Sequence, residues 1–258
     1  MKAVILAGGL GTRMQEVTHL IPKPMVKVGP YPMLWHIMKI FESHGIEDFC
    51  VALGYRGDMI KDYFMNYHSR QSDVFVDLGT NKIKNKDEHK DEKWRINLVE
   101  TGEKTQTGGR IARMKDYLDE TFMVTYGDGV ANIDIKALLA FHKSHGKIGT
   151  VTAVLPPSRF GALQIDPSNT VTKFAEKSTE GEAYINGGFF VFEPEIFDYL
   201  SADEDCVLER DPLEKLAKDG QLAAFHHKDF WQCMDTMRDI NHLNDMWDEG
   251  QAPWKMWR

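Results

Sequence analysis

The sequence predicts an α/β protein built around a mostly parallel central sheet, with a smaller β-rich subregion in its second part. Two observations support this fold class. Strand and helix patterns alternate through residues 1–155, which is typical of a parallel sheet covered by helices. From residue 156 short strands and turns replace the alternation, and no linker separates the two parts, so we expect one domain spanning residues 1–258.

The first part contains apolar runs that predict buried strands and periodic apolar stripes that predict helices. We expect strands at residues 3–7, 49–53, 96–99, 122–126 and 149–155, and helices at residues 31–45, 58–67, 111–117 and 134–145. The run from 81 to 93 is rich in lysine and acidic residues, which predicts a solvated loop or hairpin tip. His142 and His145 have no third ligand nearby, so we expect them on a solvated helix face.

The second part begins after two prolines and carries mainly short elements. We expect strands at residues 160–165, 170–174, 183–192 and 222–225, short helices at 196–200 and 212–216, and a last helix through residue 247. Trp254 and Trp257 lie near the end of the sequence. Two such apolar rings predict docking, either onto the core or onto a neighbouring subunit.

The composition limits the classes of partner. The chain of 258 residues has a formal net charge of -8 and an isoelectric point near 5.7. This argues against a nucleic-acid partner, because a phosphate backbone requires a basic face. No apolar run reaches the length of a membrane span and no signal-peptide pattern is present, so we expect a cytoplasmic protein with no membrane partner. The cysteines Cys50, Cys206 and Cys233 are widely spaced, which predicts free thiols.

The first predicted strand ends in a glycine-rich turn, Gly8-Gly9-Leu10-Gly11-Thr12-Arg13, and Lys23 follows ten residues later. Glycine amides can approach an anion closely, and Arg13 and Lys23 add positive charge. The sequence therefore predicts a phosphate-binding loop. The alternative is a tight turn that needs glycine for its torsion angles.

Two common phosphate-binding motifs do not fit this turn. A P-loop requires Gly-x4-Gly-Lys-Ser/Thr, and no such lysine follows the glycines. A dinucleotide-binding fingerprint requires a third glycine at the position of Met14, which excludes a dehydrogenase of that type.

Two further segments of the first part are candidate ligand sites. The segment Thr105-Gln106-Thr107-Gly108-Gly109-Arg110 lies just before a predicted helix, where backbone and side-chain groups could both face a ligand. Asp128 lies between two glycines at the end of a predicted strand. This position suits Mg²⁺ held by a carboxylate and substrate phosphates, although the Asp-Gly pair is also common in turns.

The second part adds groups that suit a sugar phosphate. Glu176 and Lys177 follow a predicted strand, and Asn186-Gly187-Gly188 interrupts the next one. Carboxylate, amide and ammonium groups could bind hydroxyls and phosphate, whereas the alternative is a surface salt bridge and a strand bulge. Asp235 precedes a predicted helix, so it is a candidate either for a metal ligand or for the N-cap.

Together these segments resemble the sugar-phosphate nucleotidyltransferases along essentially the full length. Several blocks resemble more narrowly those members that transfer a cytidylyl group to glucose 1-phosphate: Thr107-Gly-Gly-Arg110, Tyr126-Gly-Asp-Gly-Val130, Arg159-Phe-Gly-Ala-Leu163, Asn186-Gly-Gly-Phe-Phe190, Phe230-Trp-Gln, Met234-Asp-Thr and Ala252-Pro-Trp-Lys. The resemblance implies a Rossmann-like three-layer fold of the nucleotide-diphospho-sugar transferase type.

The resemblance implies transfer of a cytidylyl group from CTP to α-D-glucose 1-phosphate, giving CDP-glucose and pyrophosphate. Residues 1–155 would mainly bind the nucleotide, and Arg13, Lys23 and Asp128 would be catalytic. The implied nucleotide-binding residues are Leu6, Ala7, Gly8, Gly9, Gly11, Thr12, Arg13, Lys23, Thr105, Gly108, Gly109, Arg110 and Asp128.

The resemblance also implies the other components of the reaction. Residues 156–258 would mainly bind the sugar phosphate, and Asp128 with Asp235 would hold Mg²⁺. A homo-oligomer is implied too, with a hexamer as the expected state. The implied sugar-phosphate-binding residues are Gly161, Glu176, Lys177, Asn186, Gly187 and Gly188.

Two alternatives remain open from the residues. One is a related nucleotidyltransferase that uses UTP, dTTP or another sugar 1-phosphate. The other is a catalytically silent sugar-nucleotide-binding or regulatory subunit with the same fold. Joint presence of Arg13, Lys23, Asp128 and Asp235 argues against the second, because a binding module does not need paired metal carboxylates.

Overall fold

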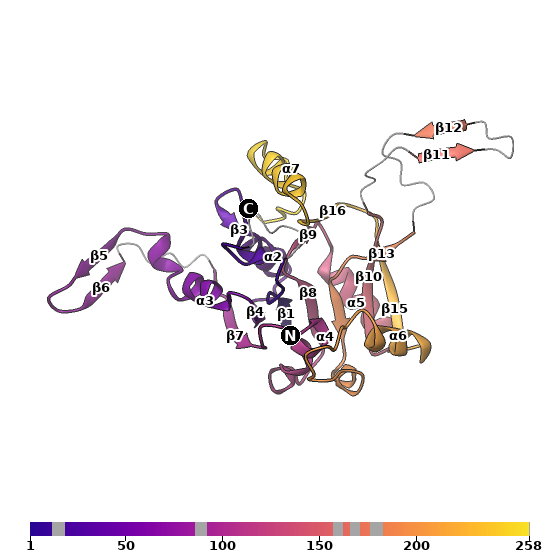
Figure 1. The fold of residues 1–258 in the computed structure, drawn as a ribbon, viewed down its shortest axis with the longest axis horizontal. Coiled ribbons are helices and arrows are strands. Elements are labelled where there is room, and N and C mark those ends of the chain that lie inside the picture. The colour runs from indigo at the N-terminus through magenta and orange to yellow at the C-terminus, as the bar shows by residue number, and fades with distance from the viewer. Residues whose placement is uncertain (12–18, 86–91, 157–161, 166–170, 176–182, 258) are drawn as a thin grey trace.

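The computed structural model describes residues 1–11, 19–85, 92–156, 162–165, 171–175 and 183–257. Its centre is an eight-stranded sheet in the order β13-β10-β14-β8-β1-β4-β7, with β15 paired to β10 (Figure 1). The strands are β1 (Lys2–Leu6), β4 (Asp48–Leu53), β7 (Arg95–Glu100), β8 (Phe122–Tyr126), β10 (Gly149–Val154), β13 (Ile185–Asn186), β14 (Phe190–Phe192) and β15 (Leu222–His227).

The strand directions confirm a mostly parallel sheet. The block β7-β4-β1-β8 is parallel throughout, and β10 is parallel to β15. β14 runs antiparallel to both β8 and β10 and so joins the two blocks. β13 also pairs antiparallel with β10, and residues 187–189 separate it from β14, which follows it in the chain.

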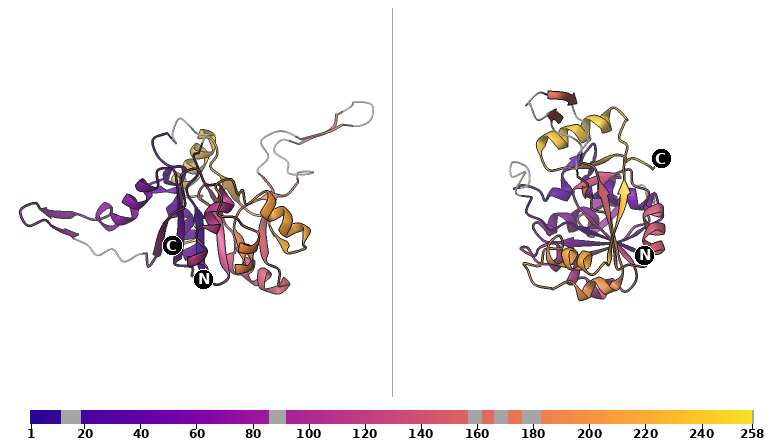
Figure 2. Two further views of the ribbon diagram at one scale, coloured as in Figure 1. Left: turned by 60° about the horizontal axis from the view of Figure 1, so that its bottom comes forward. Right: turned by 90° about the vertical axis from the view of Figure 1, so that its right-hand side faces the viewer.

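Helices cover both faces of the sheet, which gives the expected three layers (Figure 2). The helices are α2 (Met33–Glu42), α3 (Gly57–Met65), α4 (Thr107–Ala112), α5 (Ile135–His145), α6 (Asp211–Lys218) and α7 (Met237–Asp248). Val4 and Leu6 of β1 belong to the core under α4 and α6, whereas Ala3 and Ile5 belong to the core under α2, α5 and α7. Because both faces are buried, β1 is a continuous apolar run rather than an alternating one.

Short elements complete the described fold. The 3₁₀ helices are η2 (Lys23–Met25), η3 (His68–Arg70), η4 (Lys115–Tyr117) and η5 (Pro194–Asp198). Four two-stranded sheets pair β2 (Lys27–Val28) with β3 (Tyr31–Pro32), β5 (Val74–Asp77) with β6 (Lys82–Asn85), β9 (Gly129–Ala131) with β16 (Trp231–Cys233), and β11 (Ala162–Ile165) with β12 (Val171–Ala175).

Several details differ from the sequence-based expectations, and the short strands β2, β3, β5 and β9 were not expected. α4 begins at Thr107 rather than at residue 111, and β16 follows β15, which was expected to be the last strand. His142 is buried instead of solvated, because its ring nitrogens hydrogen-bond to Thr150 and to Glu193. A buried imidazole with two partners is stable without a metal.

The C-terminal tail docks onto the core of its own chain. Trp254 is fully buried, and its ring stacks on Phe230 with 5.6 Å between centroids. Its indole N–H donates to Nδ1 of His36 on α2 over 3.3 Å. Trp257 packs edge-on against Trp35 of the same helix. These contacts favour the core over a neighbouring subunit as the docking site of the tail.

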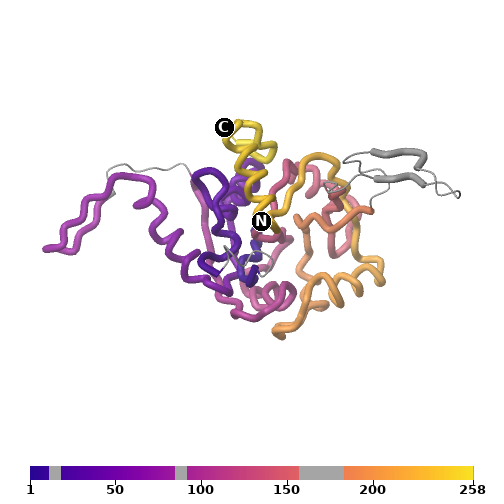
Figure 3. The backbone as a smooth tube through the Cα atoms, turned by 45° about the horizontal axis from the view of Figure 1, so that its top comes forward, coloured from indigo at the N-terminus to yellow at the C-terminus, as the bar shows by residue number. Residues whose placement is uncertain are grey.

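The β5–β6 hairpin projects from the body as an arm (Figures 1 and 3). The turn of the hairpin lies at residues 78–81, earlier than the tip expected over 81–93, and β6 forms one of its strands, while residues 86–91 lie outside the described residues. Phe75, Leu78 and Ile83 expose 62%, 89% and 65% of their surface. The arm therefore presents apolar side chains to its surroundings. No helix of the described ranges is long and apolar enough to cross a membrane.

Candidate functional site

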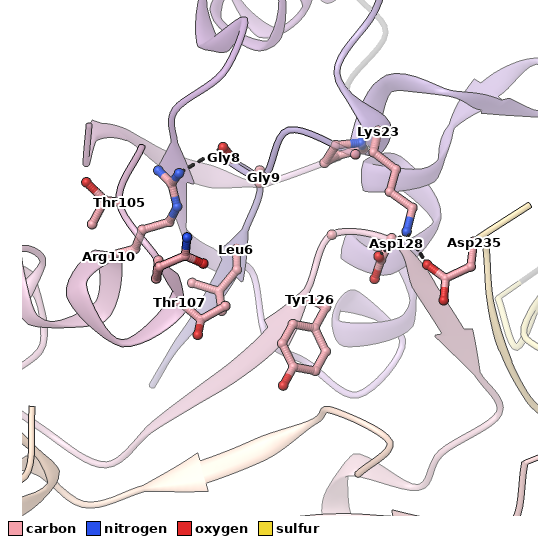
Figure 4. A pocket seen from close by; sticks show the side chains of 15 residues that line it. Leu6, Gly8, Gly9, Lys23, Thr105, Thr107, Arg110, Tyr126, Asp128 and Asp235 are labelled. Atoms are coloured by element: carbon pink, nitrogen blue, oxygen red, sulfur yellow. Dashed lines mark hydrogen bonds and ion pairs between the residues drawn. The ribbon is translucent and has the colours of Figure 1, made fainter. Parts of the chain in front are cut away.

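A pocket of about 300 Å³ opens where β1 and β8 end (Figure 4). This is the edge at which parallel α/β sheets usually bind ligands. Most of the residues expected to bind nucleotide or metal line it: Leu6, Ala7, Gly8, Gly9, Gly11, Lys23, Thr105, Arg110, Asp128 and Asp235. The structure thus brings segments from distant parts of the chain together around one cavity.

Two carboxylates and an ammonium group meet on one side of this pocket. Nζ of Lys23 lies 2.6 Å from Oδ2 of Asp128 and 2.7 Å from Oδ1 of Asp235. Figure 4 shows the lysine reaching between them. Burial alone lowers the pKa of Lys23, but the two carboxylates more than offset this and the net pKa is raised. Lys23 is therefore charged and neutralises the pair.

Pairing of β9 with β16 brings the two carboxylates together. Cys233 lies opposite Gly129, and the amide of Met234 donates to the carbonyl oxygen of Asp128 over 2.8 Å. Asp128 directly precedes the β9 side of this ladder, and Asp235 follows the β16 side by two residues. Their proximity thus depends on a strand pair that joins segments about a hundred residues apart in the sequence.

Gly127 allows the turn that carries Lys23 to pack closely against the end of β8, near Asp128 and Asp235. A Cβ atom on Gly127 would lie 2.8 Å from Cγ of Pro24 and 2.9 Å from the carbonyl oxygen of Leu6. Any larger residue would push the Lys23-Pro24 turn away from β8. The glycine before Asp128 thus permits close packing of the turn, in addition to any role near a ligand.

The Asp128–Asp235 pair fits Mg²⁺. Both carboxylates already direct oxygens at a single cation, and Mg²⁺ prefers one or two carboxylates together with phosphates and water. No group of three or more His, Cys, Asp or Glu side chains suited to a metal occurs among the described residues. Within those ranges, a bound ion would therefore need substrate or water for its remaining positions.

Asp235 is not the N-cap of α7. Thr236 is, because its side chain accepts from the amide of Asp239 while Asp239 accepts from the amide of Thr236. This reciprocal capping box satisfies the helix terminus. The cap alternative for Asp235 is therefore wrong, and its carboxylate is directed at Lys23 instead.

Arg110 fixes the loop that follows β1. Its buried guanidinium donates to the carbonyl oxygens of Gly8 (2.8 Å), Leu53 (2.9 Å) and Gly102 (2.7 Å). A Cβ atom on Gly8 would lie 2.2 Å from this group, so the contact itself requires glycine. Burial, and then the charge of Arg113, lower the pKa of Arg110. All described hydrogen bonds of Arg110 go to protein atoms. Contact between Arg110 and a nucleotide stays a prediction.

The glycines of the opening loop differ in their surroundings. No described atom lies within 4 Å of the position that a Cβ of Gly9 would take, and Gly9 is exposed at the pocket. Gly11 has a φ of 61°, a conformation that favours glycine. The open space over Gly9 is consistent with close approach of a ligand.

Gly108 and Gly109 do not line this pocket. Their Cβ atoms would lie 2.7 Å from Sγ of Cys206 and 2.4 Å from the carbonyl oxygen of Asp203. The amide of Gly109 also donates to the carbonyl of Cys206 over 3.0 Å. These glycines let the segment before α6 pack against α4, and direct binding of nucleotide by them stays a prediction.

A second cavity adjoins the first and contains the predicted sugar-side turn. Tyr126, Asp128 and Asp235 line both cavities, and Asn186 and Gly187 line the second. Gly188, with a φ of 75°, is not among the lining residues, and a Cβ atom there would lie 3.1 Å from the ring of Tyr126. The carboxylate pair therefore lies at the junction of two cavities.

Several predicted residues lie outside the described residues. They are Thr12, Arg13, Gly161, Glu176 and Lys177. Their roles stay predictions from the sequence.

Gln106 and Thr107, which belong to the predicted segment 105–110, also line the first cavity. Other lining residues were not predicted as site residues: Pro24, Tyr126, Gly127 and Trp231. Tyr126 and Gly127 adjoin Asp128 in the sequence, so the prediction of Asp128 pointed to their neighbourhood. Trp231 donates to the carbonyl of Gly187 over 2.8 Å, a long-range contact that no local pattern reveals.

Comparisons with known proteins agree with this geometry. Residues 2–251 match the family described as "Nucleotidyl transferase". The sequence is 51% identical over 260 residues to glucose-1-phosphate cytidylyltransferase of Salmonella typhi and 46% identical over 258 residues to the probable glucose-1-phosphate cytidylyltransferase of Bacillus subtilis (strain 168), covering 100% of each chain. The crystal structure of HddC from Yersinia pseudotuberculosis matches with a TM-score of 0.70 and 25% identity, over 95% of this chain and 99% of that one.

Proposed function

This chain belongs to the nucleotidyl transferase family, and we propose that it transfers the cytidylyl group of CTP to α-D-glucose 1-phosphate, giving CDP-glucose and pyrophosphate. Its fold is that of the nucleotide-diphospho-sugar transferases, as the sequence predicted. The observation that carries the proposal is the full-length similarity to two cytidylyltransferases, combined with two adjoining cavities that share Asp128 and Asp235. These relatives do not favour UTP, dTTP or a silent binding subunit.

The proposed reaction needs positioning and charge neutralisation. A phosphate oxygen of glucose 1-phosphate forms a bond to the α-phosphorus of CTP, and the bond from that phosphorus to pyrophosphate breaks. The attacking oxygen is already anionic at neutral pH, so no protein nucleophile or base is required. Lys23 would donate to phosphate oxygens, and Arg13 would add a second cation.

Each cavity would hold one substrate. The cavity at Gly8, Gly9 and Gly11 would bind the nucleotide, with Thr105 and Arg110 also in its lining. The cavity at Asn186 and Gly187 would bind the sugar phosphate, and Gly161, Glu176 and Lys177 would complete it. The carboxylate pair lies where the two substrates would meet.

A panel of nucleotides tests this function. The native chain is incubated with glucose 1-phosphate and CTP, UTP, dTTP, ATP or GTP, with and without Mg²⁺, and pyrophosphate release is measured. We expect rapid release with CTP and Mg²⁺ only. A faster reaction with UTP or dTTP would contradict the base assignment, and no release with any nucleotide would contradict the enzymatic function.

We propose Mg²⁺ as the metal of the reaction, held by Asp128 and Asp235. When bound, it would neutralise charge on the α-phosphate and the departing pyrophosphate. We expect Asp128→Asn to lower kcat at least about a hundredfold while the melting temperature changes by only a few degrees, because asparagine keeps the size of the side chain. Native kcat at saturating Mg²⁺ would contradict the metal assignment.

We also propose a cytoplasmic homo-oligomer, with a hexamer as the expected state. The exposed apolar side chains of the β5–β6 arm support association, because an isolated two-stranded hairpin is only marginally stable in water. Light scattering tests this proposal. We expect Phe75→Asp to lower the measured mass, whereas a monomeric native protein would contradict the proposal.

A further inference from the structure

Glu209 joins the walls of the two cavities by its carboxylate. It lies in the segment before α6 and is partly buried. Oε1 accepts from the hydroxyl of Tyr126 over 2.5 Å, and Oε2 accepts from the hydroxyl of Thr107 over 2.6 Å. Thr107 lines the proposed nucleotide cavity, and Tyr126 lines both cavities.

The hydrogen bonds continue from Tyr126 into the proposed sugar cavity. Nδ2 of Asn186 donates to the hydroxyl oxygen of Tyr126 over 2.9 Å, and Oδ1 of Asn186 accepts from the amide of Gly188 over 2.9 Å. A phenol has a single proton to donate. Because Glu209 accepts that proton, the oxygen of Tyr126 is left to accept from Asn186, which fixes the orientation of the Asn186 amide.

The same carboxylate orients Thr107 on the nucleotide side. The hydroxyl of Thr107 donates to Glu209 and accepts from the amide of Leu208 over 2.9 Å. Thr107 is the first residue of α4, whose next turn carries Arg110. The position of the 203–210 segment is thereby coupled to the start of α4.

We propose that Glu209 is a positioning residue that holds Tyr126 and Asn186 for the sugar phosphate and Thr107 for the nucleotide, and so couples the two substrate sites. This inference rests on the proposed function of the two cavities. Glu209 does not line either cavity and acts through the side chains that do.

The hydroxyls of Tyr126 and Thr107 both donate to the carboxylate of Glu209. Hydrogen bonds to a charged partner are stronger than neutral ones, so this network resists rearrangement.

Glu209→Gln tests the coupling. Glutamine has nearly the same shape but a single acceptor oxygen, so Tyr126 and Thr107 can no longer both donate to it. We expect KM to rise about tenfold for glucose 1-phosphate and severalfold for CTP, with a smaller change in kcat. The kinetics are measured with whichever nucleotide and sugar phosphate the native chain uses, so turnover by the native chain tests the proposed function separately.

Glu193→Gln is the matched control. Glu193 also accepts from two side chains, Thr121 and His142, but it lies after β14 at the opposite edge of the sheet. We expect this variant to lose stability to a similar extent while both KM values stay within twofold of native. Equal KM changes in the two variants would overturn the proposal.

Tyr126→Phe provides a second route if Glu209→Gln does not fold. Phenylalanine keeps the packing of the ring on Phe190 and removes only the hydroxyl. We expect a similar rise in KM for glucose 1-phosphate and little change for CTP. In the double variant with Glu209→Gln, the effects on the sugar-phosphate KM should be less than additive. Additive effects, or a native KM in Tyr126→Phe, would overturn the proposed action through Tyr126.

Discussion

Lys23 contacts both carboxylates that we assign to the metal. Its ammonium group is mostly buried, with 12% of the side chain exposed, and it compensates the charge of Asp128 and Asp235. Without a cation between them, these carboxylates would repel each other. A bound Mg²⁺ would compensate the same charge, so lysine and metal would compete for the same oxygens.

Replacement of Lys23 tests this competition. In Mg²⁺-free buffer we expect Lys23→Met to lower the free energy of unfolding by about 1–3 kcal/mol, because the carboxylates lose their partner. Added Mg²⁺ should then raise the melting temperature of the variant more than that of the native chain. Lys39→Met is the control, since Lys39 of α2 pairs with Glu42 of the same helix and with Glu92, which lies before β7. An equal Mg²⁺ response in native and Lys23→Met proteins would contradict the competition.

Candidate site residues could be predicted where the signal lies in residues adjacent in the sequence. Gly8 and Asp128 could be recognised because a strand precedes each and because the turn chemistry is local. Glu209 could not be, because it is one charged residue in the acidic stretch 203–211 and its partners lie 83 and 102 residues away. The burial of His142 was missed for the same reason, since Glu193 lies 51 residues away.

At the scale of elements, the start of α7 separates the residues that cap the helix from the residue proposed for the metal. Thr236 and Asp239 form the capping box, while Asp235 lies just before the helix and contacts Lys23. Under the proposed function, adjacent residues would serve stability and chemistry, respectively.

Two variants at this helix start should give opposite results. We expect Thr236→Ala to lower the free energy of unfolding by about 1 kcal/mol and to leave the dependence of turnover on Mg²⁺ unchanged. Asp235→Asn should leave the stability of α7 nearly unchanged and weaken the apparent affinity for Mg²⁺. Thermal unfolding and Mg²⁺ titrations of both variants provide the comparison. A larger loss of stability in Asp235→Asn would contradict this division.

Most helices and strands could be predicted from local patterns. The exceptions depend on contacts with residues that are distant in the sequence. The bounds of β8 match the prediction, since its apolar run ends at a glycine. The early start of α4 was missed because adjacent glycines usually indicate a loop; here they are required by Cys206 and Asp203. β16 has only three residues and forms by pairing with the distant β9, which no periodic pattern could reveal.

At the scale of the whole molecule, His36 and Trp254 tie the C-terminal tail to α2. Nε2 of His36 donates to the carbonyl of Val28 over 2.8 Å, and Nδ1 accepts from Trp254. This arrangement needs a neutral ring, because a protonated Nδ1 could not accept. Burial lowers the pKa of His36 from 6.5 to about 4.

Stability should therefore fall as the pH falls. Above pH 6.5 the ring is neutral in both states; between 6.5 and about 4 the unfolded chain binds a proton that the folded chain excludes. The free energy of unfolding should fall by up to about 1.4 kcal/mol per pH unit from this group across that interval. Denaturant unfolding at several pH values should show a smaller slope for His36→Gln. An unchanged slope would contradict the assignment.

The candidate site is assembled from segments far apart along the chain. Lys23 and Asp235 are 212 residues apart, and Gly8 and Arg110 are 102 residues apart. No fragment can contain the complete constellation, so during refolding from denaturant catalytic activity must appear late. We expect activity to return with the rate constant of the slowest phase seen in the fluorescence of the six tryptophans. Recovery of catalytic activity would thus measure formation of the completely folded chain.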